Sequence, residues 1–156
     1  RRSGPRRFST LARGGRVTRL AAVQAASNAL NELGVDQSLP VDPFEAIEDT
    51  GLVLSFQPMK ELLGAILPGA PGGVLINSAR PASLQRYTAA HELGHWYMDQ
   101  DVLSIDTQDS VLGHYHGEGR ELNAQVFAAH FLMPLELLHP AARSCSRYGR
   151  PLSSNG

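Results

Sequence analysis

Two histidines four residues apart constrain the fold of this chain more than any other feature. His91 and His95 lie in a segment, residues 81–98, whose apolar and aromatic side chains recur at intervals of three and four, as on one face of an α-helix. Residues four apart on a helix lie one turn above each other, so both imidazoles can reach one metal ion. Zn²⁺ binds neutral imidazole nitrogens, and a catalytic zinc site keeps one position open. The fold must therefore bring a third ligand to this helix.

Glu92 follows the first histidine directly. From that position its carboxylate can act as a general base toward the attacking water and pass the proton to the leaving amine. The run His-Glu-Leu-Gly-His therefore predicts a zinc-dependent peptidase, and only about 0.01 such runs are expected by chance in a chain of this composition. The alternative is an amphipathic helix whose histidines face solvent or fill ordinary core contacts.

The residues alone leave several candidates for the third ligand. Asp101 lies six residues after His95, as in metzincins, but Met98 stands where that motif needs a glycine with positive φ. Glu121 is the better candidate, because it lies on the next predicted helix and can project into a site between two packed helices. Gln125, one turn further on, can hydrogen-bond the second nitrogen of a ligand histidine. Weaker candidates are Glu118, Asp99, His114 and His116.

The predicted elements indicate an α+β protein. They are a helix at 17–33, a short helix from Asp42 to Gly51, strands at 52–56 and 74–77, the histidine helix, and a helix at 120–133 that Pro134 ends. Residues 99–119 are predicted to be a long polar connection. We expect a helical body with a small antiparallel sheet and a zincin-like active-site helix.

Charge divides the chain into three expected regions. Seven of the fourteen basic residues precede the first acidic residue, Glu32. We expect residues 1–16 to be a basic, poorly ordered arm, residues 17–140 to form the metallopeptidase domain, and residues 141–156 to be a flexible or truncated tail. The formal net charge of −1 makes nucleic acid an unlikely partner.

Cysteine content and hydropathy indicate the compartment. Cys145 is the only cysteine, so an internal disulfide is impossible and a reducing environment is expected. No apolar stretch approaches the ~20 residues that a membrane helix needs, and no apolar segment of a signal peptide follows the basic arm. We therefore expect a soluble, cytoplasmic protein with no membrane partner.

Three stretches, in this order, resemble the ImmA/IrrE family of bacterial metallopeptidases. They are Gly73–Asn77, Gln85–His95, and Glu121 followed by Ala124 and Phe127–Pro134. The resemblance spans about residues 35 to 140, and the joint order is more specific than the zinc motif alone.

The resemblance carries implications for the site and the substrate. It implies zinc held by His91, His95 and Glu121, with Glu92 as the catalytic residue. It also implies a gluzincin-like core in which an edge strand, residues 74–77, holds an extended peptide by backbone hydrogen bonds. Members of the family typically cleave a DNA-binding repressor, so a helix-turn-helix repressor or antitoxin-like regulator is the implied substrate.

The chain departs from the family pattern in the second helix. Asn123-Ala124-Gln125 stands where an acidic residue, alanine and then Asn or Asp are usual, although Glu121 is retained. The sequence also allows two other functions: a zinc-binding protein-interaction module with weak or absent cleavage, and a DNA-binding protein that uses the basic arm. The intact Glu92 favours cleavage over the module, and the lack of a basic recognition helix argues against DNA binding.

Overall fold

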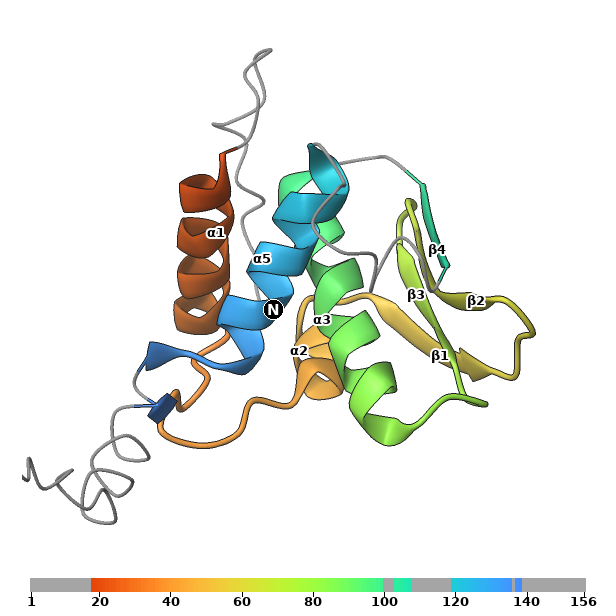
Figure 1. The fold of residues 1–156 in the computed structure, drawn as a ribbon, viewed down its shortest axis with the longest axis horizontal. Helices are drawn as coiled ribbons and strands as arrows, with labels where there is room; N and C mark the ends of the chain where they lie inside the picture. The colour runs from red at the N-terminus through yellow and green to blue at the C-terminus, as the bar shows by residue number, and fades with distance from the viewer. Residues whose placement is uncertain (1–17, 100–102, 108–118, 136, 139–156) are drawn as a thin grey trace, which may run out of the picture.

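The computed structural model describes residues 18–99, 103–107, 119–135 and 137–138. Its helices are α1 (Arg19–Glu32), α2 (Pro43–Asp49), α3 (Ala82–Met98) and α5 (Arg120–Leu132). Figure 1 shows α3 between a four-stranded sheet on one side and the helices α5 and α1 on the other. The arm predicted at 1–16 and the tail predicted at 141–156 lie outside the described residues, so those assignments stay predictions. The long connection predicted at 99–119 is wrong at Ser104–Thr107, which form a strand, and most of its other residues lie outside the described part of the chain.

The sheet is mixed. Its strands are β1 (Val53–Gln57), β2 (Leu62–Leu67), β3 (Gly73–Asn77) and β4 (Ser104–Thr107), in the spatial order β1-β3-β2-β4. β3 runs parallel to β1 and antiparallel to β2, and β2 runs antiparallel to β4. The α+β prediction is confirmed, but an all-antiparallel sheet is wrong, because the chain inserts β3 between β1 and β2.

The strand at residues 74–77 is not at an edge of the sheet. Leu75 is the register partner of Ser55 on one side and of Ala65 on the other. Both rows of its backbone groups therefore face neighbouring strands, and β1 and β4 are the edges of the described sheet. The prediction that residues 74–77 capture a peptide as an edge strand is wrong, because the two strands that flank β3 leave no open row.

Two helices begin and end where turn chemistry predicts. The Asp42 side chain accepts a hydrogen bond from Phe44 N at 3.0 Å, so this residue caps α2 just before the first-turn proline. After α1 the chain reverses through Gly34, whose φ is 65°, and after α2 it does so through Gly51 with φ 80°. Both conformations suit glycine at the end of a helix.

Helix α3 is buried on all sides along its middle. All residues from Thr88 to His95 are buried, because the sheet covers one side of the helix and α5 covers another. A helix buried in this way can carry polar side chains only where these side chains form hydrogen bonds or ion pairs. Within the described residues, no helix combines the length and apolar character that a membrane crossing requires.

Two glycines set how closely α3 packs. A Cβ atom on Gly94 would lie 3.1 Å from the ring of Phe127, so the missing side chain lets α5 approach α3. A Cβ atom on Gly64 in β2 would lie 2.5 Å from Thr88 Cγ2 and 2.8 Å from Glu92 Oε1. The sheet backbone therefore lies directly against the side chain of Glu92. These close approaches place α5 and the sheet directly against α3.

Candidate metal centre

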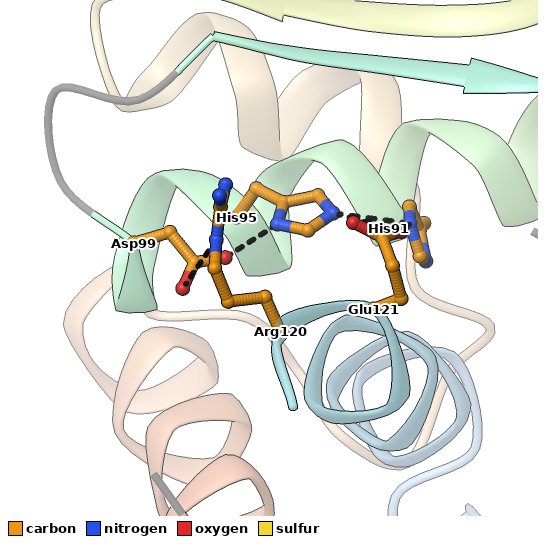
Figure 2. A network of polar contacts seen from close by, with 5 residues as sticks. All are labelled: His91, His95, Asp99, Arg120 and Glu121. Atoms are coloured by element: carbon orange, nitrogen blue, oxygen red, sulfur yellow. Dashed lines mark hydrogen bonds and ion pairs between the residues drawn. The ribbon is translucent and has the colours of Figure 1, made fainter. Parts of the chain in front are cut away.

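Three potential metal ligands meet between α3 and α5. The Nε2 atoms of His91 and His95 are 3.2 Å apart, as their one-turn spacing on α3 requires. Glu121, in the first turn of α5, places Oε2 3.4 Å from His91 Nε2 and 3.6 Å from His95 Nε2. Figure 2 shows the carboxylate reaching from α5 toward both rings. The structure thus brings together the two histidines and the favoured candidate for the third ligand.

The cluster is buried, and neighbouring carboxylates favour a positive charge on His95. Both imidazole side chains are fully buried, whereas 33% of the Glu121 side chain is exposed. Burial by itself lowers the pKa of His95, but hydrogen bonds to Asp99 and Glu121 outweigh it and raise that pKa to about 9. Hydrogen bonds from His91 and His95 hold the pKa of Glu121 well below its ordinary value. Without a metal, the neighbouring carboxylates therefore favour the protonated form of His95.

The donor chemistry fits a metal ion. One ligand atom from each of His91, His95 and Glu121 lies within 4.8 Å of the others. Two imidazole nitrogens and a carboxylate oxygen converge here, and their lone pairs repel one another unless a proton or a cation lies between them. Among the described residues, these three side chains form the one group of this kind.

Glu92 lies next to this cluster but is not part of it. The residue is fully buried, and its carboxylate lies on the side of α3 that faces β2, against Gly64. Its oxygens are not among the three converging ligand atoms. This placement suits a group that handles protons beside the metal rather than one that binds it.

Asp99 and Arg120 form a second polar layer that is not predicted from the sequence. His95 Nδ1 lies 2.5 Å from Asp99 Oδ2, and Asp99 Oδ1 lies 3.4 Å from Arg120 Nε. Asp99 is expected from the sequence only as a weaker candidate for a metal ligand, yet it contacts the ring nitrogen of His95 that points away from the cluster. Its position four residues after His95 was the available signal, since i, i+4 side chains meet on a helix.

Several other candidates are not placed. Asp101, Glu118, His114 and His116 lie outside the described residues, so nothing in the structure bears on them. Gln125 is half-buried on α5, and its contact with a ligand histidine stays a prediction. For His95 the second-nitrogen partner is Asp99.

The comparison with known protein families agrees with this geometry. Residues 47–152 match the sequence model of a peptidase family described as the IrrE N-terminal-like domain. The chain belongs to the ImmA/IrrE family. The matched segment includes both histidines, Glu92 and Glu121, so the described site lies within the region that defines this family of metallopeptidases.

Two relatives are similar over the same length of chain. The radiation response metalloprotease IrrE of Deinococcus deserti is 36% identical over 105 residues, which is 66% of this chain and 37% of that protein. The protein of the same name from Deinococcus radiodurans is 35% identical over 105 residues, 66% of this chain and 31% of that protein. The chain thus spans about a third of the length of these ImmA/IrrE relatives.

Proposed function

We propose that the chain is a zinc-dependent endopeptidase in which His91, His95 and Glu121 hold the metal. The observation that carries this proposal is the convergence of their three ligand atoms within 4.8 Å between two helices. Two imidazoles and one carboxylate are a donor set that suits zinc in a tetrahedral site with one open position. Family membership supports the same function, because both relatives are named metalloproteases.

In this proposal Glu92 is the general base. A bound zinc ion would supply Lewis-acid chemistry that polarises the carbonyl group of the peptide bond to be cut. The Glu92 carboxylate takes a proton from the attacking water as the oxygen bonds to the carbonyl carbon, and then delivers that proton to the amine nitrogen as the C–N bond breaks. The carboxylate lies against Gly64, on the sheet side of α3.

We further propose that the substrate is a DNA-binding regulator, either a helix-turn-helix repressor or an antitoxin-like protein. The support is the family resemblance, because members of the family typically cleave such a repressor. The near-neutral formal charge of −1 favours a protein partner over nucleic acid. A cytoplasmic location follows for an enzyme that meets a DNA-bound regulator.

The test is co-expression with any helix-turn-helix protein encoded beside the gene for this chain, followed by mass measurement of the fragments. The matched control is Glu92→Gln, which keeps the shape of the side chain but removes the base. We expect cleavage by the unchanged chain, a loss of about 10²–10⁴-fold in the control, and near one zinc per chain in both. Zinc binding without cleavage in either protein would instead support the interaction module.

A further inference from the structure

We propose that Asp99 and Arg120 are positioning residues for the metal centre, with Asp99 orienting His95 and Arg120 joining Asp99 to the helix that carries Glu121. This inference rests on the zinc site proposed above, but not on the identity of the substrate. Figure 2 shows the chain of contacts, which runs from His95 through Asp99 to Arg120. It links the last turn of α3 to the first turn of α5.

Asp99 determines which nitrogen of His95 faces the cluster. Its Oδ2 atom lies 2.5 Å from His95 Nδ1, and a carboxylate at that distance accepts the N–H of the ring. With the hydrogen on Nδ1, the lone pair of the neutral ring is on Nε2, the atom that lies 3.6 Å from Glu121. The contact also increases the electron density on the ring and holds its orientation, as second partners of metal-binding histidines commonly do.

Arg120 acts on the other oxygen of the same carboxylate. Asp99 is only 8% exposed, whereas Arg120 is 47% exposed, and Arg120 Nε lies 3.4 Å from Asp99 Oδ1. A carboxylate so far removed from water is stabilised by a cation at its free oxygen. The two oxygens of Asp99 are therefore occupied by partners from two different helices.

The position of Arg120 joins the two halves of the site. It is the first residue of α5, and Glu121 is the second. Gly119, before the helix, provides no side-chain cap, so the contact with Asp99 anchors this end of α5 against α3. The same carboxylate therefore orients one ligand, His95, and fixes the backbone next to another, Glu121.

The test measures zinc affinity by competition with a chromogenic chelator, and records the visible spectrum of the Co²⁺-loaded protein. The variants are Asp99→Asn, Asp99→Ala, Arg120→Ala and the pair Asp99→Ala with Arg120→Ala. Arg86→Ala is the matched control, because Arg86 also forms an ion pair from α3, with Asp42 at 3.8 Å, away from the histidines. Far-UV circular dichroism of each metal-free variant verifies that it folds.

We expect Asp99→Ala to weaken zinc binding by about 10- to 100-fold. Asp99→Asn should lose less zinc affinity, because the amide oxygen still accepts the ring N–H. Arg120→Ala should lose the least zinc affinity of the three variants. The double variant should have the same zinc affinity as Asp99→Ala, since Arg120 acts through the Asp99 carboxylate. The Co²⁺ bands should shift in the Asp99 variants and remain unchanged in Arg86→Ala, which a purely structural role for Asp99 would not produce.

Two results would overturn the inference while leaving the proposed function in place. One is unchanged zinc affinity and Co²⁺ bands in both folded Asp99 variants. The other is a double variant whose loss equals the sum of the single losses. If the unchanged chain binds no zinc, the proposed function is wrong and this inference is wrong with it.

Discussion

Glu92 and Glu121 lie beside the same pair of histidines, but they differ in what surrounds them. Glu121 reaches across from α5 and is 33% exposed, whereas Glu92 is buried on α3 against the backbone of Gly64. One carboxylate therefore faces the point where the imidazole nitrogens converge, and the other faces the sheet. In the proposed mechanism, these two glutamates therefore have different tasks.

At the residue scale, the first prediction separates the two candidates for the third ligand. Glu121→Ala removes the anionic donor and leaves two imidazoles, so metal content and cleavage should fall together. Asp101→Ala should keep both. Metal analysis of the purified variants measures this. If Asp101→Ala loses the metal and Glu121→Ala retains it, the metzincin-like arrangement is the correct one.

The second prediction concerns the pH dependence of the metal-free protein. In the folded state the pKa of His95 is raised from 6.5 to about 9. The stability from this protonated ring is therefore fully present below pH 6.5 and is lost as the pH rises through about 9. The metal-loaded protein needs the neutral ring and should not show this loss. Melting temperatures between pH 6 and pH 10, with chelator and with zinc, test the difference; parallel curves would contradict it.

At the scale of elements, the contact between β2 and α3 can be tested at Gly64. In Gly64→Ala, the new Cβ would lie 2.5 Å from Thr88 Cγ2 and 2.8 Å from Glu92 Oε1. We expect a stability loss of about 1–3 kcal/mol from overpacking. We also expect a larger fall in cleavage than in metal content, because Glu92 is displaced and the ligands are not.

Gly73→Ala in β3 is the matched control for that substitution. A Cβ atom there would lie 3.4 Å from Val53 O, which is an ordinary contact. Thermal melting and peptide cleavage should therefore show losses in Gly64→Ala but not in Gly73→Ala, and metal analysis should show that both variants keep the metal. Equal behaviour of the two alanine variants would show that Gly64 does not hold Glu92 in place.

The elements also show what could be predicted from sequence. Helices α2 and α3 were predictable because their signals are local: Asp42-Pro43 at the start of one, and the His91/His95 spacing in the other. The sequence does not predict strand β2, since Leu62–Leu67 is an apolar run without alternation, interrupted by Gly64. A strand buried on both faces lacks the period-2 pattern that identifies strands in a sequence.

The arrangement of strands and the second polar layer were harder to predict for another reason. The order β1-β3-β2-β4 depends on pairing between segments that are distant in sequence, and no residue pattern in β3 distinguishes a central strand from an edge. Arg120 shows the same limit. Its contact with Asp99 depends on how closely α5 approaches α3. That distance is set where Gly94 of α3 packs against the ring of Phe127 of α5, and this pairing is not evident from the sequence.

At the scale of the whole molecule, we expect residues 1–16 to be dispensable. This segment has no apolar periodicity that could add to the core, and the described core is built from residues after Thr18. Deleting residues 1–16 should leave the melting temperature and metal content unchanged. A drop of more than a few degrees by differential scanning calorimetry, or a loss of zinc, would mean that the arm belongs to the folded domain.

The insertion of β3 between its two predecessors has a consequence for the order in which the chain can assemble. During synthesis β1 and β2 emerge first, but neither pairs with the other in the finished sheet. β1 therefore has no native strand neighbour until residues 73–77 have left the ribosome, whereas β2 and β3 can join as a local antiparallel pair. Because nearby pairings close with less entropy loss than distant ones, we expect that pair to form first and β1 to dock onto it as nascent chain growth continues.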